Sequence, residues 1–501
     1  MNSSIRLLLS MAAVSLAACT SLPSLDETPA HGNHGGTDCF AAGATAENTR
    51  EGSGVSLFHD VKLFPNNANT GTPWTFLSPA ALAIKGKPNF SYQTCSAKYD
   101  AIVNAVVAQD RNKAGTENDG KHESYFSLKE AIATSKVPFV GLDSFYWAAD
   151  NLGLSKQSTD LTEAAFKKAL DDLCSSTVTG DNLKRTGVCP NGTFMHNFLW
   201  RADGLFSGNG NSRFVGVQPS KPVNGNPGLT WTRGYLLKQY SNQPASTPIY
   251  TAIFDAGSSG TRVSLYKVTP GSKAMIQVLG KAGFNYEDSG INDFMGENGW
   301  IDANVLPQQR LPKGCIRTTG LDQTQVGPCV LQPLLDYVTS QLPPDVDAAA
   351  VKVELFATAG MRTEDQRNGG TYTAGQISNL YDHIVKSYVR NTALANGAVY
   401  RQVGQFKTIN GNSEEGVWTW INLNEVYYDT FAVPGSCGVN QVGNFEVGGS
   451  SMQVVFPTDA AAHDTTNVYN VNINGCSINV YSKTYLGLGG DDARKFMRAV
   501  Q

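Results

Sequence analysis

A turn rich in glycine and hydroxyl side chains, set between two apolar strands, constrains this chain more than any other feature. Residues 254–262 read FDAGSSGTR; residues 248–254 predict a buried strand and 263–268 its hairpin partner. Backbone N–H groups in such a turn can converge on one anion, so a phosphate can be bound there without a helix. Asp255, at the strand end, is suited to hold a divalent metal directly or through water. The alternative for this motif alone is an ordinary Gly-Ser hairpin.

Three more segments strengthen the phosphate interpretation. An apolar strand at 353–357 runs into TAGMR at 358–362. The segment 411–424 reads GNSEEGVWTWINLN, and 445–456 reads FEVGGSSMQVVF. An acidic residue, glycines and hydroxyls therefore recur at a second strand–turn–strand. Two such turns facing each other can clamp a phosphate chain and its metal between two lobes.

The four segments, in this order, resemble the apyrase or nucleoside triphosphate diphosphohydrolase family. The shared motifs are D-x-G-S-S-x-T-R, T-A-G-M-R, G-x-x-E-E-G-x-x-x-W-x-x-x-N and a variant of D-L-G-G-A-S-T-Q. The resemblance implies an α/β fold of two actin-like (RNase H-like) lobes with a cleft between them, one lobe carrying a helical extension. It also implies metal-dependent hydrolysis of the terminal phosphates of nucleoside tri- and diphosphates.

Further segments also resemble the family, but they occur in a different order along the chain. In the family, the helical extension and a W-T-L-G-Y-like motif come last. Here the similar segments come first, and we interpret this order as a circular permutation with new termini between Gly489 and Cys39. The Pro- and Ser-rich residues 241–248 then join the original ends, which is tolerated where termini lie close at the surface. The alternative is an unrelated N-terminal domain. The segments that carry the resemblance are 38–40 (DCF), 139–152 (the aromatic helix) and 231–236 (WTRGYL).

The permutation predicts the domain organisation. The predicted parts are a lipoprotein signal peptide at 1–19, a tether at 20–37, the helical extension with part of lobe II at 38–227, lobe I at 228–405 and the remainder of lobe II at 406–501. Residues 208–228, dense in Gly, Asn and Pro, predict a loop. Apolar stripes predict helices over 331–342 and 374–389, and another that includes residues 161–173 and is capped by Thr159.

The N-terminus predicts export. Arg6 precedes an apolar run at 7–18 that is too short to span a membrane and ends in LAAC at 16–19, like a bacterial lipobox. We expect lipidation of Cys19 and anchoring at the outer membrane, on its periplasmic or surface side; the alternative is a cleaved secretory signal with an incidental cysteine. With 41% hydrophobic residues, 16% charged residues and a net charge of −4, we expect a globular monomer that does not bind nucleic acid.

Nine cysteines leave an even eight once Cys19 is set aside, which favours disulfides in an exported chain. Local spacing suggests the pairs Cys174–Cys189, Cys315–Cys329 and Cys437–Cys476, leaving Cys39–Cys95. The family resemblance supports Cys39–Cys95 and Cys174–Cys189 in the helical extension.

The resemblance assigns the chemistry residue by residue. Glu415, directly before Gly416, aligns with the family's general base; the alternative is that Glu414 or Glu415 only stabilises a helix N-terminus. Ser451 and Gln453 align with the residues that hold the attacking water. Asp255 and Glu446 are the expected metal-side carboxylates for Ca²⁺ or Mg²⁺, although Glu446 stands where the family has Asp. The expected phosphate contacts are Gly257, Ser258, Ser259, Thr261, Arg262, Thr358, Ala359, Gly448 and Gly449, with Arg262 alternatively bracing the loop through a carboxylate.

An aromatic platform for the nucleobase is expected on the aromatic helix. Trp147, beside Tyr146, falls at the family's base-stacking position, and Arg185 or Lys184 is the expected opposing plane. Stacking of this kind tolerates any base. The alternative is that these rings form part of an aromatic core.

Two other functions remain open from the sequence. The first is that of an exopolyphosphatase or guanosine pentaphosphate phosphatase. These enzymes share the fold associated with the D-x-G-S motif, but their sequences lack the W-x-x-x-N segment and the disulfide-bearing helical extension. The second is that of a catalytically inactive nucleotide-binding lipoprotein. Its only support is that Glu446 replaces the Asp found in the family.

Overall fold

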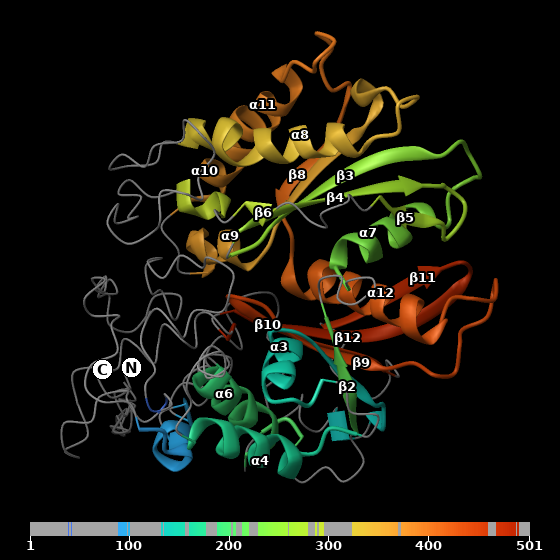
Figure 1. Ribbon diagram of the computed structural model, residues 1–501. Helices are drawn as coiled ribbons and strands as arrows, with labels where there is room; N and C mark the ends of the chain where they lie inside the picture. Colours follow the sequence, from blue (N-terminus) through green and yellow to red (C-terminus); the bar gives the residue numbers. More distant parts are fainter. Residues whose placement is uncertain are drawn as a thin grey trace, which may run out of the picture. The chain divides into compact units, whose positions relative to one another are not determined.

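Two six-stranded sheets organise the part of the chain that the structure describes (Figure 1). The computed structural model describes residues 39, 42, 89–97, 99–100, 132–133, 135–155, 160–176, 188–201, 204–206, 213–219, 229–258, 260–278, 286–287, 290–294, 323–368, 372–458, 467–486 and 488–489. Within these residues, no helix is long and apolar enough to cross a membrane.

The first sheet, sheet I, comes from one continuous stretch of chain. Its strand order is β5-β4-β3-β7-β8, with β6 (Tyr286–Glu287) paired to β4. β3 pairs antiparallel with β4 and parallel with β7, and β7 pairs parallel with β8. The β3–β4 hairpin confirms the predicted strands around the FDAGSSGTR turn. The main strands are β3 (Ile249–Ala256), β4 (Thr261–Val268), β5 (Met275–Gln277), β7 (Lys352–Ala357) and β8 (Gln402–Thr408).

The second sheet, sheet II, combines strands from both ends of the chain. Its order is β11-β12-β10-β9-β1-β2. As in sheet I, one strand, here β9, pairs antiparallel with its hairpin partner β10 and parallel with a further strand, β1, which pairs parallel with β2. In sheet I the two parallel strands follow the hairpin in the chain, whereas in sheet II they precede it. The strands are β1 (Phe139–Asp143), β2 (Phe214–Gln218), β9 (Gly443–Val447), β10 (Ser451–Pro457), β11 (Val468–Ile473) and β12 (Cys476–Leu486).

Helices on one face of sheet I form its outer core. The predicted helix over 331–342 is confirmed by α8 (Gln332–Gln341). The one over 374–389 is confirmed as α10 (Ala374–Asn379), a π-helical turn at Leu380–Val385 and α11 (Lys386–Asn391). Apolar residues of these helices pack with those of β3, β4 and β7 in one cluster. β8 continues to Thr408, across the predicted lobe boundary at 405/406.

Helices α7 (Trp231–Tyr240) and α12 (Val417–Tyr428) share a core with residues of both sheets, including Phe356 of β7 and Val455 of β10. The two helices approach unusually closely: a Cβ on Gly234 would lie 1.8 Å from the carbonyl oxygen of Trp418. Only glycine permits this contact. The WTRGYL segment is therefore a packing element that joins α12 to sheet I.

On sheet II, the face away from α7 and α12 is covered by three helices. They are α3 (Ser144–Asn151), α4 (Glu163–Cys174) and α6 (Val188–Trp200). Three sequence predictions here are corrected. Residues 139–143 of the aromatic segment form strand β1, because they pair between β9 and β2. The predicted loop at 208–228 contains β2. The N-cap of α4 is Thr162, whose side chain accepts from the Ala165 N–H, and not Thr159.

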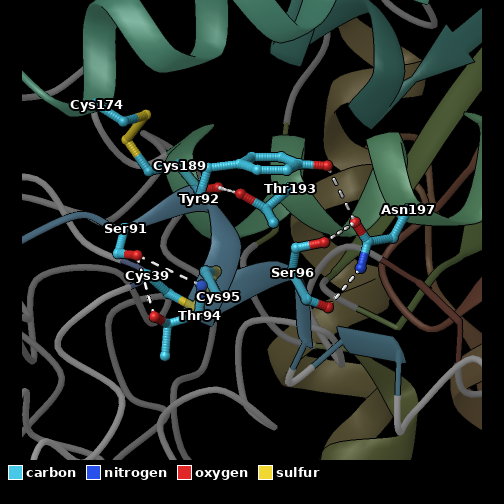
Figure 2. The surroundings of a disulfide bond; sticks show 10 residues. All are labelled: Cys39, Ser91, Tyr92, Thr94, Cys95, Ser96, Cys174, Cys189, Thr193 and Asn197. Atoms are coloured by element: carbon cyan, nitrogen blue, oxygen red, sulfur yellow. Dashed lines mark hydrogen bonds between the residues drawn. A yellow bond between two sulfur atoms is a disulfide. The ribbon is translucent and has the colours of Figure 1, made fainter. Parts of the chain in front are cut away.

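Disulfides tie the helical extension together (Figure 2). Cys39–Cys95 and Cys174–Cys189 are formed as predicted, and so is Cys437–Cys476 elsewhere in the chain. Beside the first pair, Ser96 donates to Asn197 Oδ1 at 2.7 Å, and Asn197 donates back to the Ser96 carbonyl at 2.6 Å. The predicted pair Cys315–Cys329 involves Cys315, which lies outside the described residues.

Candidate active site

The two glycine turns have the same local geometry in the two sheets. The turn after β3 is closed by a hydrogen bond from Gly257 N to Gly260 O at 2.9 Å, and the turn after β9 by one from Gly448 N to Ser451 O at 2.9 Å. An acidic residue precedes each turn, Asp255 on β3 and Glu446 on β9. The cross-strand partner of Asp255 is Arg262, and that of Glu446 is Gln453.

The TAGMR segment adjoins the first turn. Thr358 N donates to Ala256 O at 3.0 Å, so the end of β7 is bonded to the end of β3. A Cβ on Gly360 would lie 2.8 Å from the Cα of Ser258, and glycine is therefore needed for this approach. Thr358 and Ala359 thus lie beside the predicted phosphate turn. Ser259 of that turn lies outside the described residues.

Glu414 and Glu415 have different environments. Glu415 lies in a π-helical turn, Gly411–Gly416, directly before α12, and is 7% exposed. Such turns are frequent at functional sites. Glu414 points elsewhere: it accepts from Lys407 Nζ at 2.6 Å and from Asn410 N at 2.8 Å, which braces the turn. Of the two glutamates, Glu415 is the one that is hydrogen-bonded to a predicted water-binding residue, Gln453.

Glu415 belongs to a closed ring of hydrogen bonds in which each of four side chains contributes one polar atom. Arg362 Nη2 donates to Glu415 Oε2 at 2.7 Å and to Ser451 Oγ at 3.1 Å. Gln453 Nε2 donates to the same two oxygens, at 3.0 Å and 2.8 Å. Glu415, Ser451 and Gln453, predicted from segments far apart in sequence, are therefore brought together.

Arg362 is the last residue of the TAGMR motif, and the sequence alone predicts no role for it. It extends from α9 (Ala359–Glu364), is 8% exposed, and also donates from Nη1 to Ile409 O at 3.1 Å. The signal available in the sequence was its position, one helical turn after the Thr358–Ala359 turn, because a side chain there lies on the same helix face as the start of the helix.

The two carboxylates predicted to face the metal, Asp255 and Glu446, are held in an environment that disfavours their charge. Burial raises the pKa of Asp255 to about 6, with Glu415 and Asp143 adding to the shift and Arg262, 3.8 Å away, opposing it. Burial, Glu415 and Asp143 also raise the pKa of Glu446. Within the described residues, Glu446 Oε2 is buried and accepts no hydrogen bond. The Arg262–Asp255 ion pair matches the loop-bracing alternative for Arg262.

The predicted base platform is only partly described. Trp147 is half-buried on α3, with its ring edge-to-face against Tyr146 at a centroid distance of 5.1 Å. Tyr146 is 9% exposed and belongs to the aromatic core. Trp231, on α7, packs against Phe356 and Trp418. Arg185 and Lys184, like Cys19, lie outside the described residues.

Comparison with known protein families identifies this arrangement. The model of the GDA1/CD39 (nucleoside phosphatase) family matches residues 241–501, just over half of the chain and including all four motif segments. The chain belongs to this family. The match begins at Ser241, the C-cap of α7, directly before the exposed residues 242–248.

Members of the GDA1/CD39 family from other organisms align with the chain at low identity. The guanosine-diphosphatase of Schizosaccharomyces pombe is 24% identical over 256 residues, covering 50% of this chain and 37% of that protein. The human ectonucleoside triphosphate diphosphohydrolase 2 is 26% identical over 251 residues, with 48% and 42% covered. The human nucleoside diphosphate phosphatase ENTPD5 is 24% identical, with 53% and 52% covered. The chain therefore spans about half or less of the length of these relatives.

A solved structure of nucleoside triphosphate hydrolases from Neospora caninum aligns with 50% of this chain and 46% of that chain, at 18% identity and a TM-score of 0.33.

The GDA1/CD39 family depends on divalent cations, and the residues at this site fit such an ion through water. Asp255 and Glu446 offer the oxygen atoms that hard cations prefer, and no described residue donates a hydrogen bond to the buried Glu446 Oε2. Across the described ranges, no three His, Cys, Asp or Glu side chains gather closely enough to bind a metal directly. Ordered waters would then bridge the carboxylates to the ion.

Proposed function

We propose that this protein hydrolyses the terminal phosphate of nucleoside tri- and diphosphates, with Glu415 activating the attacking water. The observation that carries the proposal is the hydrogen-bonded ring of Arg362, Glu415, Ser451 and Gln453, which stands beside a Gly-Ser turn in each sheet. Membership of the nucleoside phosphatase family and the names of its relatives support the substrate class.

The ring leaves one donor and two acceptors that can hydrogen-bond a water molecule. Both hydrogens of Arg362 Nη2 and both of Gln453 Nε2 are used on Glu415 Oε2 and Ser451 Oγ. Ser451 therefore accepts twice and has its hydroxyl proton to donate, while Glu415 Oε1 and Gln453 Oε1 remain as acceptors. A water held by these groups donates two hydrogen bonds and accepts one. Its remaining lone pair is available to attack phosphorus.

The reaction then balances in one displacement. The water oxygen forms a bond to the terminal phosphorus as the bridging P–O bond breaks, and the electron pair of that bond leaves with the shortened nucleotide. Glu415 Oε1 takes the proton of the attacking water. Little covalent chemistry is required of the protein, because positioning and charge neutralisation supply most of the rate.

The phosphate chain would be held by the two turns. Backbone N–H groups around Ser258 and Gly449, with those after Thr358, can face its oxygens, and the glycines in these segments leave room for a close approach. A bound Ca²⁺ or Mg²⁺ would neutralise the phosphates, held through water by Asp255 and Glu446. Trp147 would stack on the base, with Arg185 opposite and Tyr146 supporting it.

The same proposal includes a location. The Leu16–Cys19 motif supports lipidation of Cys19 and anchoring of a monomer at the outer membrane, on the periplasmic or surface side. Incorporation of a radiolabelled or alkyne fatty acid, lost in Cys19→Ala, would test this part.

Phosphate release tests the function directly. We expect release from ATP and ADP, none from AMP or polyphosphate, activity with Ca²⁺ or Mg²⁺, and none with EDTA. Glu415→Gln should lower kcat by at least ~10²-fold while nucleotide still binds. Glu414→Gln is the matched control, since it removes the neighbouring carboxylate that only braces the turn, and it should retain most activity.

Release from polyphosphate but not ATP would instead indicate an exopolyphosphatase. Tight nucleotide binding without release would indicate an inactive binding protein. Equal loss of activity in Glu414→Gln and Glu415→Gln would contradict the assignment of Glu415 as base.

A further inference from the structure

Asp143 stands on a strained turn between a strand and a helix. It ends β1 and precedes α3, with φ 53° and ψ −118°, a conformation that non-glycine residues rarely adopt. Gly141 accommodates the turn, because a Cβ there would lie 2.5 Å from the Phe145 ring and 2.7 Å from that of Phe214. Such strain costs of order 1–3 kcal/mol and is typical of functional positions. The sharp change from strand to helix projects the side chain beyond the carboxyl end of β1.

The strand register brings Asp143 beside the second glycine turn. In the parallel β1–β9 pair, Leu142 is opposite Glu446 and Asp143 is opposite Val447, the residue directly before Gly448. The negative charge of Asp143 contributes to the raised pKa of both Glu446 and Asp255. Its carboxylate therefore lies on the phosphate side of the site, from a strand that the four family motifs do not include.

The helix that follows connects Asp143 to the base platform. Trp147 is four residues further on, so it lies on the same face of α3, about 6 Å along the helix axis. Both side chains are half-buried. Asp143 thus stands between the residue proposed to stack on the base and the turn proposed to bind the phosphates, which is where a nucleotide carries its ribose.

We propose that Asp143 accepts hydrogen bonds from the ribose hydroxyls and makes this protein selective for ribonucleotides over 2′-deoxyribonucleotides. A carboxylate is an acceptor-only group and binds a pair of neighbouring hydroxyls well; acidic residues do this in dinucleotide sites. A direct metal role is disfavoured, because Asp143 forms no metal-binding group of three with other described acidic residues. The inference rests on the proposed nucleotide hydrolysis.

The test compares kcat/KM for ATP and 2′-deoxy-ATP in full-length protein. We expect the wild type to prefer ATP by about tenfold or more, because a site built to bond a hydroxyl rejects the analogue that lacks it. Asp143→Gly, which also relieves the strained backbone, should bring the ratio close to one, chiefly by raising KM for ATP. Asp143→Asn, which matches the aspartate in size and keeps one acceptor oxygen, should be intermediate. Asp150→Asn, an exposed charge change on the same helix, should leave the ratio unchanged.

Equal use of the two nucleotides by the wild type, or a ratio that survives in Asp143→Gly, would overturn the ribose role while leaving the hydrolase function intact. A shift in the Mg²⁺ or Ca²⁺ concentration for half-activation, with the ribose preference unchanged, would overturn it in favour of a metal role. No release from either nucleotide would overturn both the hydrolase function and this inference.

Discussion

Arg362 donates to Glu415 at 2.7 Å, and through that bond a helix attached to sheet I contacts the residue proposed to act as base. The same nitrogen also reaches Ser451 at the start of β10, in sheet II. Arg362 and Glu415 are both less than a tenth exposed. Breaking a buried pair leaves an uncompensated charge, which is strongly destabilising. One guanidinium therefore sets the relative positions of Glu415, Ser451 and the TAGMR turn.

Substitution of Arg362 should impair the positioning of Glu415 and Ser451 as well as stability. We expect Arg362→Lys to lose at least ~10-fold and Arg362→Gln ~10²-fold in kcat, since a misplacement of about 1 Å costs that much. Lysine keeps the charge but lacks the fork that reaches two acceptors. Arg367→Gln is the control: this mostly exposed arginine pairs locally with Asp365 and should remain active. Wild-type kcat in Arg362→Gln would show that the ring is not needed.

Glu446→Asp restores the family's residue and should change the Mg²⁺/Ca²⁺ activity ratio. The shorter side chain withdraws the carboxylate by about one bond length, which matters for Mg²⁺ because it demands near-octahedral geometry at ~2.1 Å. The ratio is measured at saturating concentrations of each metal. Glu425→Asp, on α12 and paired with Lys273, is the same substitution outside the site and should leave the ratio unaltered. If Glu446→Asp keeps both activity and ratio, Glu446 is not near the metal.

Much of this arrangement was predictable because its determinants are local. Glycine turns after apolar strands mark Asp255 and Glu446, and the G-x-x-E-E-G motif marks Glu415. The roles of Arg362 and Asp143 were not predictable, because they depend on contacts between elements far apart in the chain. Arg362 meets Glu415 only when α9 and the turn before α12 pack together. Asp143 reaches the site only because β1 pairs with β9, some 300 residues later.

The strand β2 was missed for a related reason. Its surroundings are rich in Gly and Asn, and local composition predicted a loop. Pairing with β1 overrides that tendency, since strand preference depends strongly on tertiary context.

His196 should make the helical extension sensitive to acid. Burial lowers its pKa to about 4, helped by Lys167 and Arg201, while the unfolded value is near 6.5. Between these values the unfolded chain binds a proton that the folded chain does not, so stability is complete above pH 6.5 and is lost as the pH falls toward 4. The loss is up to about 3 kcal/mol. His196→Asn should reduce the fall in Tm between pH 7 and pH 4.5; the exposed His383→Asn should not. If Tm falls as much in His196→Asn as in the wild type, then His196 is not held neutral in the folded protein.

The shared strand pattern of the two sheets supports the predicted circular permutation. Rotating the chain so that it starts at β3 would place β1 and β2 after the β9–β10 hairpin, as β7 and β8 follow the β3–β4 hairpin in sheet I. The proposed junction is suited to this, because residues 242–248 are exposed and lie between the end of α7 and the start of β3. The family match also begins at residue 241.

A rearranged chain tests the permutation. The segment 249–489 followed by 38–242 should fold and hydrolyse ATP at a rate close to that of the native order, because termini can be moved within exposed loops. Deleting 20–227 should instead abolish activity, because it removes β1 and β2 from sheet II and uncovers apolar residues such as Phe445 and Val454 that now pack with α3, α4 and α6. Size-exclusion chromatography and phosphate release are measured for both. A soluble, fully active 249–501 fragment would show that the N-terminal region is an accessory domain, since a half-built sheet could not sustain the site.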